Sequence, residues 1–462
     1  MEILPGPVLR FHVYQEQREE QIAELLQTCE RLGIREVALF TADYICGEVF
    51  PTMEGLQARL DHLNICAERI RRAGLVFSLN VMHTLGHLYV PQQDIDRFGF
   101  SRQVDADGQP GKHPILDPAC PKLREHLAET FRLYAQLRSR LMFVDDDYAV
   151  PLEQCYLPQR LKRFSEEFDC NAAPKTIQGL LASPDGTTPH RAISLMTRLA
   201  SEDLTTLAEI LRTAVHSVEP GTRLGQMFSG QVPPAAIIGV ARALAGPHQP
   251  FVRPQIPPYR EEAPLTYYPR MFWEIEVWKS RLPADFEFYP ECENYPYYTS
   301  LKSPAAAYAH FSSILGAGEP RVALSLNSFA TIVPACESRE LVDYFAASKG
   351  QVRAVVNELA AAGELQGPGV CVDGGLDLLQ LKGVPLRCAA PDEALIQWGV
   401  GLNSLSDEAI ARRLKRGAIL DLRSATILHD RGVLKLTGLE LQERCSLDDL
   451  MHIAFPRRDG GI

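Results

Sequence analysis

Long apolar runs, paired cysteines and nucleotide-binding glycine loops are all missing from this chain. No apolar stretch is long enough to cross a bilayer, and residues 1–7 lack the charged and apolar regions of a signal peptide. The 11 cysteines include no C-x-x-C pair, which argues against a structural zinc site or a disulfide framework. These absences favour a cytoplasmic protein with reduced thiols, no membrane association and no cofactor.

The chain also has fewer basic than acidic residues. The chain has 47 Lys and Arg residues against 58 Asp and Glu residues, a formal net charge of -11. Nucleic acid and anionic membranes both need a basic face, so neither is an expected partner. Hydrophobic residues make up 46% of the chain and charged ones 23%, which is typical of a globular protein. A length of 462 residues predicts two domains.

Apolar runs of strand length alternate with amphipathic segments over residues 1–334. Strands are expected at 9–14, 37–40, 75–81, 141–144, 222–228, 250–253, 286–289 and 321–326. Helices are expected at 16–32, 53–73, 121–137, 191–218, 235–245, 270–281 and 303–315. Eight strand–helix units favour an α/β fold of the (β/α)8 TIM barrel type. A doubly wound sheet is the competitor, but it should carry a glycine-rich phosphate turn, and neither G-x-G-x-x-G nor a P-loop occurs.

Residues 335–462 predict a second, smaller α/β domain. Its expected helices are 341–362, 392–398, 406–415 and 424–430, and its expected short strands are 369–372, 385–388 and 418–421. Few polar residues follow these strands, so we expect a flavodoxin-like packing or oligomerisation module rather than a second active site.

Two clusters of acidic residues follow apolar runs of the first domain. Glu291 and Glu293 come directly after the run 285–289, and residues two apart on a strand point the same way. Asp145, Asp146 and Asp147 follow the run 141–144, where the first and third should share a face with the second opposite. Carboxylates at the C-terminal ends of barrel strands predict acid–base or nucleophilic catalysis. Tyrosines around residue 295 favour a sugar as substrate.

Polar residues after the other strands are expected to bind that substrate, because a barrel's active site lies at this end. They are Arg10, His12, Asp43, Asn80, His83, Arg253, Tyr259, Asn294 and Tyr295. His87 follows His83 by four residues, and one of the two is expected to line the site. Two other functions stay open. One is a metal-dependent sugar isomerase or epimerase, because closely spaced carboxylates can bind a divalent metal; its ligands would be Asp145, Asp147, His83 and Glu291. The other is a carbohydrate-binding protein without catalysis.

Several segments resemble a known family. Residues 143–148, 291–297 and 301–303 are similar to the clan A glycoside hydrolases, and most of all to the family 42 β-galactosidase-like proteins and their β-mannosidase-like relatives. Residues 405–409, 417–421 and 428–432 look like the amidotransferase-like trimerisation domain of that group, here shortened.

The resemblance implies a retaining, exo-acting β-glycosidase of the β-galactosidase or β-mannosidase type, with a carbohydrate as its partner and no metal. It makes Glu291 the nucleophile with Glu293 in reserve, gives the acid/base role to Asp145 or Asp147, and implies a homo-oligomer, a trimer by resemblance. The chain departs from the clan by having three aspartates where Asn-Glu is usual. An Asp sets its carboxyl back by about one bond length, so an inverting mechanism, which needs more widely spaced carboxyls, stays open.

Overall fold

A computed structural model describes the chain. The described residues are 6–42, 49–87, 90–111, 115–183, 187–229, 234–261, 264–293, 302–326, 334–362, 369–372, 387–389, 392–398, 402, 405–420, 422–433 and 435. Contacts divide the chain into two compact units, 1–364 and 365–462. The domain boundary expected at residue 334 stays a prediction, and helix α11 (Pro334–Ala362) packs on α1 and α10 within the unit 1–364.

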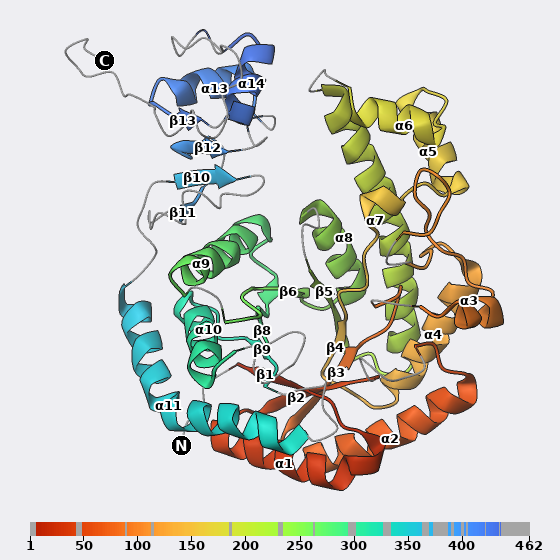
Figure 1. Ribbon diagram of the computed structural model, residues 1–462, viewed down its shortest axis with the longest axis vertical. Coiled ribbons are helices and arrows are strands. Elements are labelled where there is room, and N and C mark those ends of the chain that lie inside the picture. The colour runs from red at the N-terminus through yellow and green to blue at the C-terminus, as the bar shows by residue number, and fades with distance from the viewer. Residues whose placement is uncertain are drawn as a thin grey trace. The chain divides into compact units, whose positions relative to one another are not determined.

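A parallel sheet forms the centre of the first unit (Figure 1). Its strands follow the order β7-β6-β5-β4-β3-β2-β1-β9-β8, and every pairing is parallel. The strands are β1 (Val8–Phe11), β2 (Glu36–Phe40), β3 (Val76–Val81), β4 (Leu141–Val144), β5 (Arg223–Phe228), β6 (Phe251–Pro254), β7 (Glu287–Phe288), β8 (Glu291–Cys292) and β9 (Ala323–Leu324). Each expected strand of this domain is confirmed within a few residues, and the TIM barrel is confirmed with it.

The seventh expected strand is divided in two, and this division closes the barrel. β7 pairs with β6, whereas β8, three residues later, pairs with β9. Pro290 lies between them and has no N–H to donate, but its carbonyl accepts a hydrogen bond from the N–H of Ala323 (3.0 Å). Both ends of the strand order therefore belong to one continuous segment, 287–292, which joins the two edges of the sheet.

Side chains inside the barrel lie in layers, as alternation along the strands requires. An apolar layer fills the middle, with Phe143 packed edge-to-face on the rings of Phe251 and Tyr289. The other members of this layer are Val8, Ala38, Leu141, Met227 and Ala323. At the N-terminal ends of the strands, Glu36 pairs with Arg140, and Glu287 pairs with Arg223 (2.8 Å). Ion pairs thus close one end of the barrel, and the polar side chains described below occupy the other end.

Helices surround the barrel, and the strands bury Leu, Ile and Val side chains against them. The helices of the first unit are α1 (Arg18–Leu32), α2 (Met53–Arg72), α3 (Gln92–Phe98), α4 (Pro121–Ala135), α5 (Pro158–Phe168), α6 (Pro174–Leu181), α7 (Thr187–His216), α8 (Pro234–Ala245), α9 (Pro264–Arg281), α10 (Pro304–Gly316) and α11. The expected helices are confirmed, whereas α3, α5 and α6 were not expected from the sequence. Among the described residues, no helix combines the length and apolar character that crossing a membrane requires.

A helical lobe formed by α5, α6 and the N-terminal half of α7 rises beside the barrel (Figure 1). α7 leads into β5, so its C-terminal end lies at the N-terminal end of the strands. Its 30 residues span about 45 Å, more than twice the length of β5, so its first half extends past the C-terminal ends of the strands. Buried Arg160 of α5 is paired with Asp203 of α7 (2.6 Å) and ties the lobe together.

The second unit contains a parallel sheet in the order β11-β10-β12-β13. Its strands are β10 (Gly369–Val372), β11 (Arg387–Cys388), β12 (Ile396–Trp398) and β13 (Ile419–Leu420), with α13 (Asp407–Leu414) and α14 (Leu422–Asp430). The helix expected at 392–398 is wrong, because β12 lies there between β10 and β13. Backbone pairing on both sides outweighs the helical propensity of a seven-residue segment. The order follows the start of the flavodoxin-like order, but that class stays a prediction for this unit.

Candidate active site

Five strands bring one buried polar side chain each to the C-terminal end of the barrel interior. These side chains are Arg10 on β1, Asn80 on β3, Asp145 directly after β4, Arg253 on β6 and Glu291 on β8. None is more than 2% exposed. Arg10, Asp145, Arg253 and Glu291 each come two residues after a member of the apolar layer, and Asn80 comes two residues after Ser78 on β3. All five were expected site residues, and the structure brings them together.

Glu291 lies at the centre of this group. Its Oε1 contacts Nη1 of Arg10 (2.5 Å) and Nη2 of Arg253 (2.6 Å), and its Oε2 accepts a hydrogen bond from the hydroxyl of Tyr259. Charged donors form the strongest hydrogen bonds with carboxylates, so the two guanidinium groups stabilise the negative charge of Glu291. A carboxylate oxygen has about two lone-pair sites. Counting contacts of the described residues only, Oε1 is therefore fully engaged, whereas Oε2 keeps one lone pair.

Arg10 and Asn80 connect Glu291 to the aspartates after β4. Nε of Arg10 donates to Oδ1 of Asn80 (2.9 Å), and Nδ2 of Asn80 donates to Oδ2 of Asp145 (2.5 Å). The Arg10 guanidinium also lies over the ring of Phe40, 4.9 Å from its centroid. Both acidic clusters therefore belong to one buried hydrogen-bonded network.

Glu293 is held by the same arginine. Nη1 of Arg10 donates to its Oε2 (2.8 Å), so one nitrogen contacts both glutamates. Burial, and then the neighbouring charge of Glu291, raise the pKa of Glu293 to about 8. Glu293 is accordingly protonated at neutral pH and adds no negative charge beside Glu291.

Asp145 and Asp147 are both committed to hydrogen bonds. Burial raises the pKa of Asp145, but the charges of His87, Arg253 and Arg10 outweigh it and hold that pKa below its usual value. Asp147 accepts hydrogen bonds from the backbone N–H groups of residues 84–86 and from the Thr84 hydroxyl (2.7 Å). Burial nevertheless raises the pKa of Asp147 to about 6. Its oxygens hold the loop after β3.

Asp146, which the sequence placed on the opposite face, is the aspartate with an accessible carboxyl. Its side chain is 20% exposed, and its Oδ1 is 3.5 Å from Nδ1 of His87. Burial raises the pKa of Asp146, and the charge of Asp145 raises it further. The charges of Arg253 and Glu291 also act on this pKa, which places Asp146 at the same end of the barrel. Sequence reasoning missed it because strict alternation does not continue past the end of β4.

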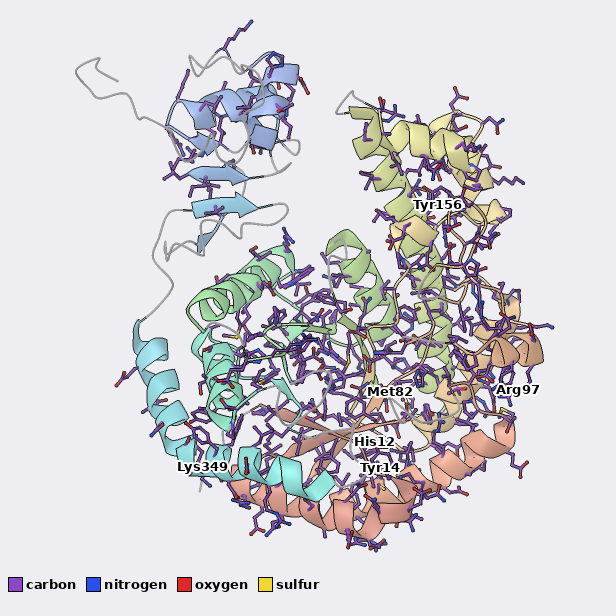
Figure 2. The ribbon with its side chains drawn as sticks, viewed as in Figure 1. His12, Tyr14, Met82, Arg97, Tyr156 and Lys349 are labelled. Carbon is purple, nitrogen blue, oxygen red and sulfur yellow. The ribbon has the colours of Figure 1, made fainter. Side chains whose placement is uncertain are left out.

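The two expected histidines lie differently. His12 lies against Tyr14, with ring centroids 4.3 Å apart, and both side chains are labelled in Figure 2. Burial, followed by the charges of His62 and Arg59 of α2, lowers the pKa of His12 to about 3. His83 lies 6.4 Å from His87, centroid to centroid. Asp43, Asn294 and Tyr295 lie outside the described residues.

Lys302 and His310 form a buried pair that sequence reasoning did not select. Nζ of Lys302 donates to the carbonyl of Glu293 (2.9 Å) and lies 3.0 Å from Nδ1 of His310. Burial lowers the pKa of both groups, most strongly that of His310. The amine thus anchors the backbone that carries the two glutamates. Its only sequence signal is a Lys a few residues after an acidic strand end.

Three ligand-type side chains come close enough to share a cation. Among the described residues, His87, Asp145 and Asp146 each offer one atom, and these atoms lie within 4.8 Å of one another. Of the ligand set considered from the sequence, only Asp145 belongs to this group. The guanidinium of Arg253, 3.7 Å from Asp145, competes electrostatically with any metal there.

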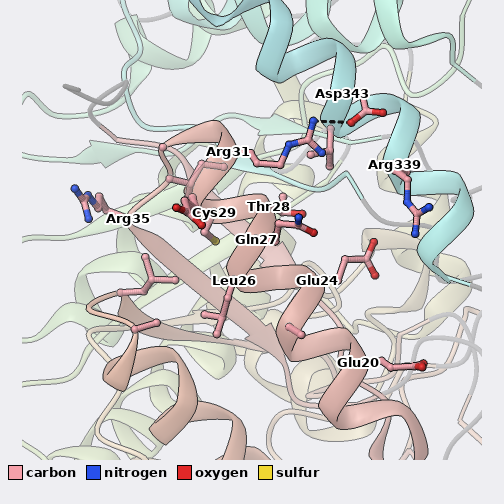
Figure 3. Close-up of a pocket in the computed structure, with 17 residues that line it drawn as sticks. Glu20, Glu24, Leu26, Gln27, Thr28, Cys29, Arg31, Arg35, Arg339 and Asp343 are labelled. Atoms are coloured by element: carbon pink, nitrogen blue, oxygen red, sulfur yellow. Dashed lines mark hydrogen bonds and ion pairs between the residues drawn. The ribbon is translucent and has the colours of Figure 1, made fainter.

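A cavity of about 1270 Å³ lies at the other end of the unit (Figure 3). α1, α11 and the turns that precede β2 and β3 line it, so it opens beside the N-terminal ends of the strands. Its charged lining includes the ion pair between Arg31 and Asp343 (2.5 Å). It contains none of the candidate residues, and active sites of TIM barrels lie at the opposite, C-terminal end of the strands.

Comparisons with known proteins identify the fold. No family model and no curated protein matches the chain. Among solved structures, the β-galactosidase of the psychrophilic Marinomonas ef1 is 13% identical with a TM-score of 0.56, and the match covers 90% of this chain and 75% of that one. A catalytic mutant of a GH42 β-galactosidase from G. stearothermophilus is 11% identical with a TM-score of 0.57, over 89% and 70% of the two chains.

A second kind of enzyme has the same architecture. Alpha-L-fucosidase isoenzyme 2 from Paenibacillus thiaminolyticus is 11% identical with a TM-score of 0.57, over 91% of this chain and 64% of that one. The resemblance stated from the sequence is confirmed at the level of the fold, which this chain shares with these barrels.

Proposed function

We propose that this protein is a retaining, exo-acting β-glycosidase that hydrolyses a neutral sugar glycoside of the β-galactoside or β-mannoside class. The observation that carries the proposal is the buried network joining Glu291 to the aspartates after β4 through Arg10 and Asn80. Glycoside hydrolysis needs two carboxyl groups that flank the bond to be broken, one a nucleophile and the other a proton donor. Glu291 and the Asp145–Asp147 run supply these groups from two different strand ends, those of β8 and β4.

Glu291 is the nucleophile in this proposal. Among the described residues Oε2 has one hydrogen-bond donor, Tyr259, and so one lone pair is left for the reaction. A bond forms between Oε2 and the anomeric carbon while the bond from that carbon to the leaving oxygen breaks. Arg10, Arg253 and Tyr259 fix the carboxylate in one orientation before substrate binds. Glu293, which Arg10 also contacts, is a positioning residue for Arg10.

Asp146 is the proton donor in this proposal. Its carboxyl is partly accessible and its pKa is raised, whereas Asp145 and Asp147 are engaged in hydrogen bonds. Asp146 gives its proton to the leaving oxygen. It then takes a proton from the water that attacks the anomeric carbon and releases Glu291. His87, next to Asp146, orients the carboxyl.

A panel of nitrophenyl glycosides tests the proposal. Wild type should hydrolyse one β-glycoside, and Glu291→Gln should lower kcat by about 10³-fold or more, since it removes the nucleophile. Glu293→Gln is the matched control and should retain turnover at neutral pH. A 2-deoxy-2-fluoro glycoside of the accepted sugar should label wild type covalently, and peptide mapping should find the label on Glu291. Labelling at another residue, or hydrolysis with inversion, would contradict the mechanism.

Azide distinguishes the three aspartates. In a variant without its acid/base, the glycosyl–enzyme formed from a dinitrophenyl glycoside waits for a nucleophile that needs no deprotonation. Added azide should therefore restore turnover in Asp146→Ala and yield a glycosyl azide. Asp145→Ala and Asp147→Ala, which lose structural hydrogen bonds, should show no such rescue. Rescue in one of those two variants instead would move the acid/base role to that residue.

A metal-dependent sugar isomerase or epimerase is the second candidate, and the cluster of His87, Asp145 and Asp146 is the observation that favours it. Sugar interconversion that EDTA abolishes and Mn²⁺ restores would support this candidate. We also propose that residues 335–462 serve self-association into a homo-oligomer, a trimer by resemblance, which light scattering on the full chain tests.

A further inference from the structure

Arg253 is a buried cation, and two of its nitrogen donors make no hydrogen bond with the described residues. Its side chain is almost wholly buried, and Nη2 contacts Glu291 Oε1 (2.6 Å) and faces Asp145 Oδ1 (3.7 Å). Its Nε and Nη1 are also buried, and neither has a hydrogen-bond partner among the described residues. Buried donors are nearly always paired, and leaving one unpaired is costly. An unpaired guanidinium edge beside a catalytic carboxylate therefore indicates a ligand.

The position of Arg253 limits which part of a sugar it can reach. The guanidinium contacts Glu291 and faces Asp145. If Glu291 attacks the anomeric carbon, the reacting sugar binds next to this guanidinium. The hydroxyl on C2 is attached to the carbon next to the anomeric one. It is thus the sugar hydroxyl nearest to any group that contacts the nucleophile directly.

The local charges indicate a hydroxyl rather than an acidic group as the ligand. Three acidic side chains besides Glu291 interact electrostatically with Arg253, and two of them follow β4: Asp145, Asp146 and Glu293. A carboxylate on the sugar would be repelled by the negative charges of Glu291 and Asp145. Ionised carboxylates accept hydrogen bonds and cannot donate them, so Glu291 and Asp145 leave the oxygen of a C2 hydroxyl without a donor. The N–H groups of Arg253 supply that donor.

We propose that Arg253 hydrogen-bonds the C2 hydroxyl of the sugar whose anomeric carbon faces Glu291, and so selects a neutral, 2-hydroxylated glycone. This inference rests on the proposed glycosidase function. Hydrogen bonds to the C2 hydroxyl strengthen as the transition state forms, so Arg253 contributes more to kcat/KM than to ground-state binding.

A substrate-by-variant cycle tests this role. The nitrophenyl β-glycoside that wild type hydrolyses best and its 2-deoxy counterpart are compared in wild type, Arg253→Met and Arg253→Lys. Removing the hydroxyl should lower kcat/KM of wild type by about 10²-fold or more, as expected when a donor loses its partner. The same removal should cost Arg253→Met less than about 3-fold, because the interaction is already gone.

Matched controls separate this role from a general defect. The 6-deoxy counterpart should cost wild type and Arg253→Met equally. Tyr259→Phe, which alters the other oxygen of Glu291, should keep the full 2-deoxy penalty. Circular dichroism checks folding, and Arg253→Lys, which keeps the charge, replaces Arg253→Met if that variant does not fold.

The outcomes are distinguishable. Equal 2-deoxy penalties in wild type and in both Arg253 variants would overturn the inference while leaving the glycosidase intact. Faster hydrolysis of a hexuronide than of the matching neutral hexoside would overturn the assignment to a hydroxyl. Absence of turnover on every glycoside by wild type would overturn the proposed function, and the inference with it.

Discussion

Replacing Glu293 by Gln should change the pH dependence of folding stability, because this carboxyl keeps its proton in the folded chain. Its pKa is raised from 4.5 to about 8 by burial and by the charge of Glu291. In the unfolded chain the same group ionises near its ordinary value. Between these two pH values the unfolded state has lost a proton that the folded state retains, so wild type loses stability as pH rises.

The size of the effect follows from the shift. Each pKa unit corresponds to about 1.4 kcal/mol, so the free energy of unfolding of wild type should fall by roughly 5 kcal/mol across this window because of Glu293 alone. Gln resembles the protonated acid in shape, still accepts from Arg10, and does not titrate. Stability of Glu293→Gln relative to wild type should therefore rise with pH, by about 1.4 kcal/mol per pH unit.

Urea unfolding of both proteins at several pH values between about 5 and about 8 measures this slope. Glu125→Gln, at an exposed position of α4, is the matched control for replacing a carboxyl by an amide. A flat difference for Glu293→Gln would mean that Glu293 titrates alike in both states. A falling difference would mean that Glu293 is an ionised partner of Arg10 in the fold, the opposite of the reasoning above.

Three further changes test other contacts. Tyr259→Phe removes the hydrogen bond to Oε2 of Glu291 and should lower kcat by about 10- to 100-fold, the worth of a hydrogen bond to a charged group, with little change in melting temperature. Asp203→Ala leaves the buried guanidinium of Arg160 without its carboxylate partner, and should destabilise the helical lobe by about 3–5 kcal/mol in urea unfolding; a cost below about 1 kcal/mol would contradict this. EDTA should leave the hydrolysis rate unchanged, and a rate that falls and returns with Mn²⁺ would favour the metal-dependent alternative.

The barrel could be predicted because its local patterns agree with its global fold. Apolar runs such as 141–144 are buried on both faces in a parallel sheet, and each is followed by an amphipathic helix. Positions at the ends of these runs predicted that Arg10, Asn80, Asp145, Arg253 and Glu291 would lie together at one end of the barrel. β12 was assigned wrongly because a three-residue strand has no period of its own and depends on pairing with β10 and β13.

Which of the three aspartates has the accessible carboxyl could not be predicted in the same way. Backbone N–H groups of the loop after β3, more than 60 residues earlier in the chain, bind the carboxylate of Asp147. That loop decides which carboxyl is engaged and which is accessible, and no pattern within 145–147 contains this information. Lys302 was missed for a similar reason, since its partners are a carbonyl oxygen and a histidine on α10.

The segment that closes the barrel also limits how this gene can vary. Glu287 and Glu291 point into the barrel from the two sides of Tyr289, and each meets two arginines, Arg223 and Arg321 for the first and Arg10 and Arg253 for the second. Inserting or deleting one codon between them would turn one glutamate outward, towards the helices. Single substitutions in this segment keep both glutamates facing inward, whereas an insertion or a deletion does not. Homologues should therefore share an invariant spacing between these two acids even where the intervening residues differ.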